Sequence, residues 1–142
     1  MIQDGVEVVG NSAFLQTVMG SSNWRAWSYG IQYVELPNTL KEIGSYAFAG
    51  QSKLQTITIP SEVISIGWRA FAANSSLEEV TIDSTFVAAN LSEEDSQGDL
   101  LEHAQTVYIK SDITQIGEYI TSNFTKQATS DKPGYDKYVR NE

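Results

Sequence analysis

Apolar side chains recur along this chain in a pattern that fits neither a continuous helix nor a continuous strand. Sliding the sequence by about 23 residues aligns IQYVELPNTLKEIGSYAFAGQSK (31–53) with LQTITIPSEVISIGWRAFAANSS (54–76). In the second segment the apolar positions are Leu54, Ile57, Ile59, Val63, Ile66, Ala70 and Phe71. Such uneven spacing predicts a coil that turns every few residues and directs selected side chains inward.

Local signals predict how each coil is built. The run TITI before Pro60 predicts a short strand with Ile57 and Ile59 on one face, which Pro60 ends because proline has no amide hydrogen. Residues 63–66 predict a second short extended run. Gly67 then predicts a turn, and RAFAAN after it predicts about one turn of helix.

Weaker copies flank the two full coils. Residues 5–14 are a partial first coil, 77–103 are an irregular coil, and 104–120 are the last coil. A single coil buries too little apolar surface to offset its conformational entropy, so stability belongs to the stacked array. We therefore predict one repeat domain over residues 1–142, with about five coils, mainly β with minor α.

The repeated positions resemble the BspA-type leucine-rich repeat, whose coil runs L-x-x-I-x-I-P-x-x-V-x-x-I-G-x-x-A-F. The match is strong over 31–82 and partial over 5–14 and 104–120. The resemblance implies a right-handed leucine-rich repeat solenoid with parallel strands, on the surface of bacteria or secreted by them. It also implies adhesion and binding of host proteins, and no catalytic residues.

An aromatic insertion at 15–30 interrupts the repeat. It holds Trp24, Arg25, Trp27 and Tyr29, which are candidate partner-binding residues because exposed aromatic and arginine side chains anchor interfaces. The alternatives are a cap over the open end of the solenoid and a carbohydrate-binding patch made by the same aromatic residues.

The repeat also predicts which residues share the exposed face of the strands. One row is Glu35, Thr58, Thr81 and Tyr108, and the neighbouring row is Tyr33, Thr56, Glu79 and Thr106. These rows are mixed and mostly polar, so no ligand groove is predicted there. Tyr33, Glu35 and Tyr108 are the candidate partner-binding residues of this face.

Composition excludes several functions. Nine basic and eighteen acidic residues give a net charge of −9, which disfavours nucleic acid and anionic membranes. There is no cysteine, no run of about 18 apolar residues, and no nucleotide-binding motif. The acidic run 90–104 lacks the spacing of a calcium loop, and the single His103 has no nucleophile motif beside it. We therefore expect no metal, no cofactor and no enzymatic activity.

The two ends of the array differ. Residues 121–142 predict a C-terminal cap in which Phe124, Tyr135 and Tyr138 lie across the last coil, with a turn at Pro133-Gly134. The first coil lacks a strand before it, which favours a longer parent chain and predicts weak edge-to-edge self-association.

These observations together favour a non-catalytic interaction or adhesion module, extracellular or on the cell surface. Its expected partner is a protein, such as a host surface or matrix protein. The alternatives are a carbohydrate-binding module that uses Trp24, Trp27 and Tyr29, and an accessory domain packed on an enzyme in the parent chain.

Overall fold

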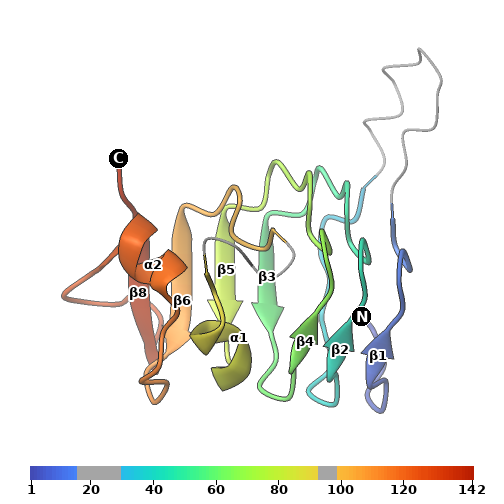
Figure 1. The fold of residues 1–142 in the computed structure, drawn as a ribbon, viewed down its shortest axis with the longest axis horizontal. Coiled ribbons are helices and arrows are strands. Elements are labelled where there is room, and N and C mark those ends of the chain that lie inside the picture. The colour runs from blue at the N-terminus through green and yellow to red at the C-terminus, as the bar shows by residue number, and fades with distance from the viewer. Residues whose placement is uncertain (16–29, 93–98) are drawn as a thin grey trace.

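The computed structural model describes residues 1–15, 30–92 and 99–142, and it is mainly β with few helices (Figure 1). In chain order the elements are β1 (Val8–Val9), β2 (Glu42–Ile43), β3 (Thr56–Ile59), β4 (Ser65–Ile66), β5 (Glu79–Ile82), α1 (Thr85–Ala89), β6 (Thr106–Lys110), α2 (Glu118–Asn123), β7 (Phe124–Lys126) and β8 (Tyr135–Arg140). The repeats follow one another along the long axis of the molecule, from β1 at one end to β8 at the other.

The strands form two sheets, and equivalent positions of the repeat pair with each other. One sheet has the order β1-β2-β4, all parallel; the other has the order β3-β5-β6-β8-β7. In the second sheet Thr58 pairs with Thr81, which pairs with Tyr108, as the repeat predicts. The predicted strand before Pro60 is confirmed as β3, and the second extended run is confirmed in part as β4.

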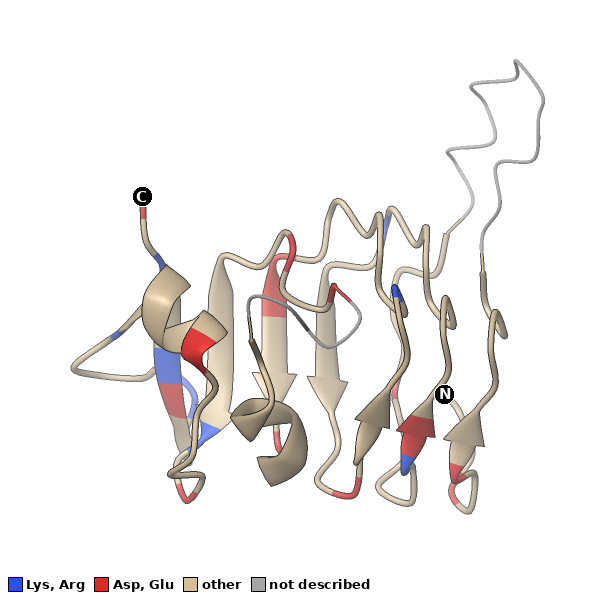
Figure 2. Cartoon of the chain, in the orientation of Figure 1, with Lys and Arg blue, Asp and Glu red and all other residues tan. Residues whose placement is uncertain are grey.

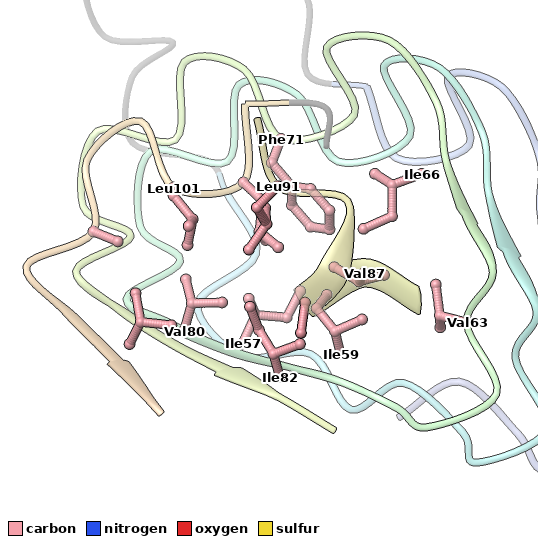
Figure 3. Packing of buried hydrophobic residues seen from close by; sticks show 14 of the residues in the cluster. Ile57, Ile59, Val63, Ile66, Phe71, Val80, Ile82, Val87, Leu91 and Leu101 are labelled. Atoms are coloured by element: carbon pink, nitrogen blue, oxygen red, sulfur yellow. The ribbon is translucent and has the colours of Figure 1, made fainter. Parts of the chain in front are cut away.

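The inward side chains form one core that passes through the stack (Figure 3). Its axis is a column of phenylalanine rings. Phe14 and Phe48 stack with ring centroids 5.2 Å apart, and Phe48 and Phe71 stack at 5.6 Å. Phe48 and Phe71 are 0% and 1% exposed. Phe48 and Phe71 are 23 residues apart, so the stacking of equivalent positions of the repeat accounts for their contact inside one core.

Close contact between the turns keeps the repeats in register. At Gly44 and Gly67, the glycines of G-x-x-A-F in the two full repeats, the turn passes so near the turn of the previous repeat that a side chain cannot fit. A Cβ atom on Gly67 would lie 2.3 Å from the backbone nitrogen of Ser45. Two residues later in each turn the backbone is left-handed, with φ of 58° at Tyr46 and 53° at Arg69. The turns are therefore rigid, and they aim the side chains that follow the glycine outward.

Three parts of the repeat differ from the prediction. Residues 31–37 form no strand, and Glu35 accepts a backbone hydrogen bond from Ile2 instead, at 3.1 Å. The segment after Gly67 forms hydrogen-bonded turns rather than a turn of helix, since left-handed Arg69 and Ala73 interrupt it. The irregular coil contains α1, which begins because the Ser84 hydroxyl accepts from the amide of Val87 at 3.0 Å.

The C-terminal segment extends the second sheet. β8 pairs antiparallel with β6, and β7 pairs antiparallel with β8 at the edge of the sheet. Phe124 and Tyr138 are buried, at 3% and 6% exposure. The predicted turn at Pro133-Gly134 is confirmed. These residues thus close the core as part of the sheet.

Candidate interaction surface

Two of the residues that the sequence proposes for partner binding, Tyr33 and Glu35, lie in the segment 31–37, which forms no strand. The repeat makes them equivalent to Thr56 and Thr58 of β3, and we call these positions together with the exposed side of the second sheet the strand face. Tyr33 is 65% exposed, and its hydroxyl donates to the Glu35 carboxylate at 2.5 Å. This hydrogen bond raises the pKa of Tyr33. Beside them β3 presents Thr56 and Thr58, which are also exposed. These four residues are therefore exposed to solvent, and all of them carry polar groups.

Tyr108 lies on the same face but is only 5% exposed, so the expectation that it is open to a partner is wrong. The connection between β7 and β8 folds over it. The Tyr108 hydroxyl donates to Asp131 at 2.7 Å, and the Lys132 ammonium lies 5.2 Å from its ring centroid. The same ammonium donates to the Thr81 hydroxyl at 2.6 Å, so Thr81 is buried as well. The sequence could not show this cover because it comes from a segment outside the repeat.

We predict that the stability of the C-terminal part, which holds the β7–β8 connection and β8, depends on alkaline pH. Burial and a hydrogen bond to Asp83 raise the pKa of Tyr135 from 10.0 to about 12, and hydrogen bonding to Asp131 raises the pKa of Tyr108. A raised tyrosine pKa stabilises the folded chain fully below about pH 10, and that contribution is lost as the pH rises toward about 12. We therefore expect the stability of the C-terminal sheet to fall over this interval.

Tyrosinate absorbance and circular dichroism, recorded together between about pH 8 and pH 12, measure this transition. The variant Tyr135→Phe is the control, because it keeps the ring and removes the titrating hydroxyl. It should lose less stability over the same interval. Unfolding of both proteins along one identical pH curve would contradict the assignment to Tyr135.

Trp24, Arg25, Trp27 and Tyr29 lie outside the described residues. Their proposed part in binding therefore rests on the sequence.

A second exposed surface lies on the turns that follow the glycines, and we call Tyr46, Trp68 and Arg69 the Trp68 cluster. Trp68 is 64% exposed. The Tyr46 ring meets it edge-on with centroids 5.3 Å apart, and the Arg69 guanidinium lies 4.8 Å from its centroid. The amide of Tyr46 also donates to the Trp68 carbonyl at 3.1 Å. Neighbouring repeats thus hold an aromatic pair and a cation in one fixed arrangement.

A shallow groove of about 410 Å³ adjoins the turn that carries Trp68. Its lining includes Gly44, Ser45 and Gly67, and at both glycines a Cβ atom would clash with the neighbouring turn. The adjoining β2 adds the carboxylate of Glu42. A partner that covered Trp68 would find beside it a hollow that admits a side chain.

The sequence analysis missed the Trp68 cluster, although the sequence carries a signal for it. In G-x-x-A-F the two variable positions are not among the inward ones, and they hold Ser45 and Tyr46 in one coil and Trp68 and Arg69 in the next. A large aromatic residue at a position that the repeat directs outward is expected to be exposed.

Charge is unevenly distributed over the molecule (Figure 2). Five of the nine basic residues lie at or after position 110, and Figure 2 places several of them on and around β8. These five are Lys110, Lys126, Lys132, Lys137 and Arg140. The earlier part of the chain is therefore strongly acidic, and Arg69 is a local exception on its surface.

In the described ranges no three histidine or acidic side chains come together as metal ligands would. His103 lies 3.7 Å from the carboxylate of Glu102 on the surface. Among the helices of the described part, none has the length and apolar character that crossing a membrane requires.

Parallel strands that recur with the sequence period, over one continuous core, are typical of a protein built from stacked repeats. A family model for the BspA type leucine rich repeat region matches residues 21–128 in six copies. The chain belongs to this family. A search of curated proteins and a search of solved structures each returned no match.

Proposed function

We propose that this chain is a non-catalytic adhesion module of a cell-surface or secreted bacterial protein, and that it is part of a longer chain. Its partner is a protein, such as a host surface or matrix protein. The stack of about five coils, with the boundaries given above, serves as a rigid support. Membership of the BspA-type family supports the surface interaction role. Weak self-association through the outer edge of β1 is part of the same proposal.

The observation that carries the proposal is the exposed Trp68 cluster. Tryptophan, tyrosine and arginine are the residues most enriched at the energetic centres of protein interfaces. Here they lie together on turns that neighbouring repeats lock in place, so little entropy is lost when a partner orders them. A partner with an apolar group over Trp68 and a carboxylate beside Arg69 suits this surface. Tyr33 and Glu35 offer a second, more polar contact on the strand face.

Binding of the purified chain to a panel of immobilised matrix proteins, and to cultured epithelial cells, tests the proposal. We expect Trp68→Ala to weaken binding by about 30-fold or more, since removing a central tryptophan costs about 2–4 kcal/mol. Arg69→Ala should weaken it less. Binding of Tyr33→Ala measures whether the strand face contributes to partner binding.

The control is Glu78→Ala, an exposed substitution away from the Trp68 cluster, which should bind as the unmodified chain does. Full binding by Trp68→Ala would show that the cluster is not the contact. Failure of the unmodified chain to bind any matrix protein or cell would count against the adhesion role itself.

A further inference from the structure

In the part of the chain that the structure describes, the first sheet ends at β4, and no described strand pairs with the outer edge of β4. In β1 and β2 the backbone carbonyls accept hydrogen bonds from the next repeat. These bonds run from Glu42 to Glu7 at 3.1 Å, from Gly44 to Val9 at 2.8 Å, from Ile64 to Lys41 at 2.9 Å and from Gly67 to Ile43 at 2.7 Å. The equivalent carbonyls in the third repeat belong to Ile64 and Ile66. Within the described ranges no backbone amide donates to either of them.

Helix α1 causes this gap. The repeat would place residues 88–89 beside Ser65 and Ile66, but 85–89 are helical and cannot continue the ladder. One repeat later the contact resumes. The amide of Gly117 donates to Ala88 at 2.7 Å, and the amide of Tyr119 donates to Leu91 at 3.1 Å. Helix α1 therefore separates the third repeat from the irregular coil in the first sheet, while β3 and β5 of the same two repeats remain paired in the second sheet.

A groove of about 600 Å³ lies at the interruption. Ile64, Phe86 and Ile116 contribute apolar side chains to its walls, and the first two are 54% and 46% exposed. Among its described lining residues Glu118 is the one charged side chain. The groove thus combines a free strand edge, exposed apolar side chains and one carboxylate.

We propose that this groove binds an extended peptide segment, with alternating apolar residues and at least one lysine or arginine, as an added strand on β4. The peptide amides would donate to the carbonyls of Ile64 and Ile66, because strand addition to an open sheet edge satisfies unpaired backbone groups. Its apolar side chains would contact Ile64 and Phe86. Its cation would face Glu118.

Charge selects this occupant over a second copy of the chain. A second copy of a chain with net charge −9 would bring mostly like charge against Glu118, whereas a basic segment would bring opposite charge. The weak self-association proposed above uses the outer edge of β1, which is a different surface. The inference takes the general interaction role from the proposed function but uses a different surface and a defined mode of binding.

The first test uses a fluorescent heptapeptide of alternating valine and lysine, with binding measured by anisotropy and by amide chemical shifts. Two further peptides carry N-methyl groups, one on the valine amides and one on the lysine amides. Successive amides of a strand point to opposite sides, so only one set can face β4. We expect one methylated peptide to bind at least about tenfold more weakly and the other to bind nearly as the parent does.

The second test exchanges charge. Glu118→Lys should weaken binding of the valine–lysine peptide by about tenfold and should allow a valine–glutamate peptide to bind. Ile64→Ser should weaken the binding of both the valine–lysine and the valine–glutamate peptide. Trp68→Ala should leave peptide binding unchanged, because Trp68 is not among the residues lining this groove. We expect Trp68→Ala to lose matrix binding and keep peptide binding. We expect Ile64→Ser to lose peptide binding and keep matrix binding. These opposite results separate this inference from the proposed function.

The inference is overturned if the valine–lysine peptide does not bind at about 1 mM, the weak limit of useful recognition. It is also overturned if both methylated peptides bind like the parent, since strand addition would then play no part. Self-association that Ile64→Ser abolishes, without peptide binding, would assign the groove to a second copy instead.

Discussion

Gly67→Ala is expected to lower the free energy of unfolding by about 3 kcal/mol, while Gly10→Ala changes it by less than about 0.5 kcal/mol. The new Cβ of Gly67→Ala would lie 2.3 Å from the nitrogen and 2.8 Å from the Cα of Ser45. These are backbone atoms, so no side chain can rotate away. The two turns would have to separate, and the phenylalanine column beneath them would lose contact.

Gly10 is the matched control because it holds the same position in an earlier repeat. A Cβ there meets nothing within 4 Å. The two substitutions share the same loss of backbone freedom in the unfolded chain and differ in the native contact. Urea unfolding followed by circular dichroism compares them directly. Equal destabilisation by both would mean that the close approach of the turns does not hold the repeats together.

Phe48→Ala should cost about 3–5 kcal/mol, the second large effect. Phe48 is fully buried and has a stacked ring on both sides, at 5.2 Å and 5.6 Å. Its removal leaves a cavity in the middle of the column, which rigid turns prevent from collapsing. Since a domain is stable by only about 5–15 kcal/mol, this one change should make folding marginal.

Phe14→Ala provides the comparison, because Phe14 is 40% exposed and, among the described residues, stacks on the ring of Phe48 alone. Its loss should cost about half as much or less, since less apolar area returns to water. Thermal and urea unfolding of the unmodified chain, Phe48→Ala and Phe14→Ala give the differences in the free energy of unfolding. If Phe14→Ala were as damaging as Phe48→Ala, burial within the column would not explain the effect.

The period predicted those parts of the fold in which each repeat contacts its neighbour. It placed Phe48 next to Phe71 and paired Thr58 with Thr81, because identical spacing forces identical registers. It could not place α1 or the antiparallel strands β7 and β8. These elements depend on a single serine cap and on contacts with β6, and neither leaves a periodic signal.

The candidate surface was less predictable than the fold. Tyr33 and Glu35 are exposed on the strand face, as the alternation of the repeat indicates. Tyr108 occupies the equivalent row but is covered by Lys132, from a connection whose path no local pattern shows. Burial of an outward residue is decided by whatever folds over it. The Trp68 cluster was accessible to sequence reasoning, since its position in the turn alone directs it outward.

The backbone hydrogen bonds between neighbouring strands run along the row of strands, and their direction determines how the molecule would respond to mechanical load. The two termini lie near opposite ends of the row of strands (Figure 1). Tension between Met1 and Glu142 would act along the hydrogen bonds between strands and strain one ladder at a time. A tether built this way should lengthen in steps, so that it absorbs a sudden pull by releasing terminal repeats before central ones.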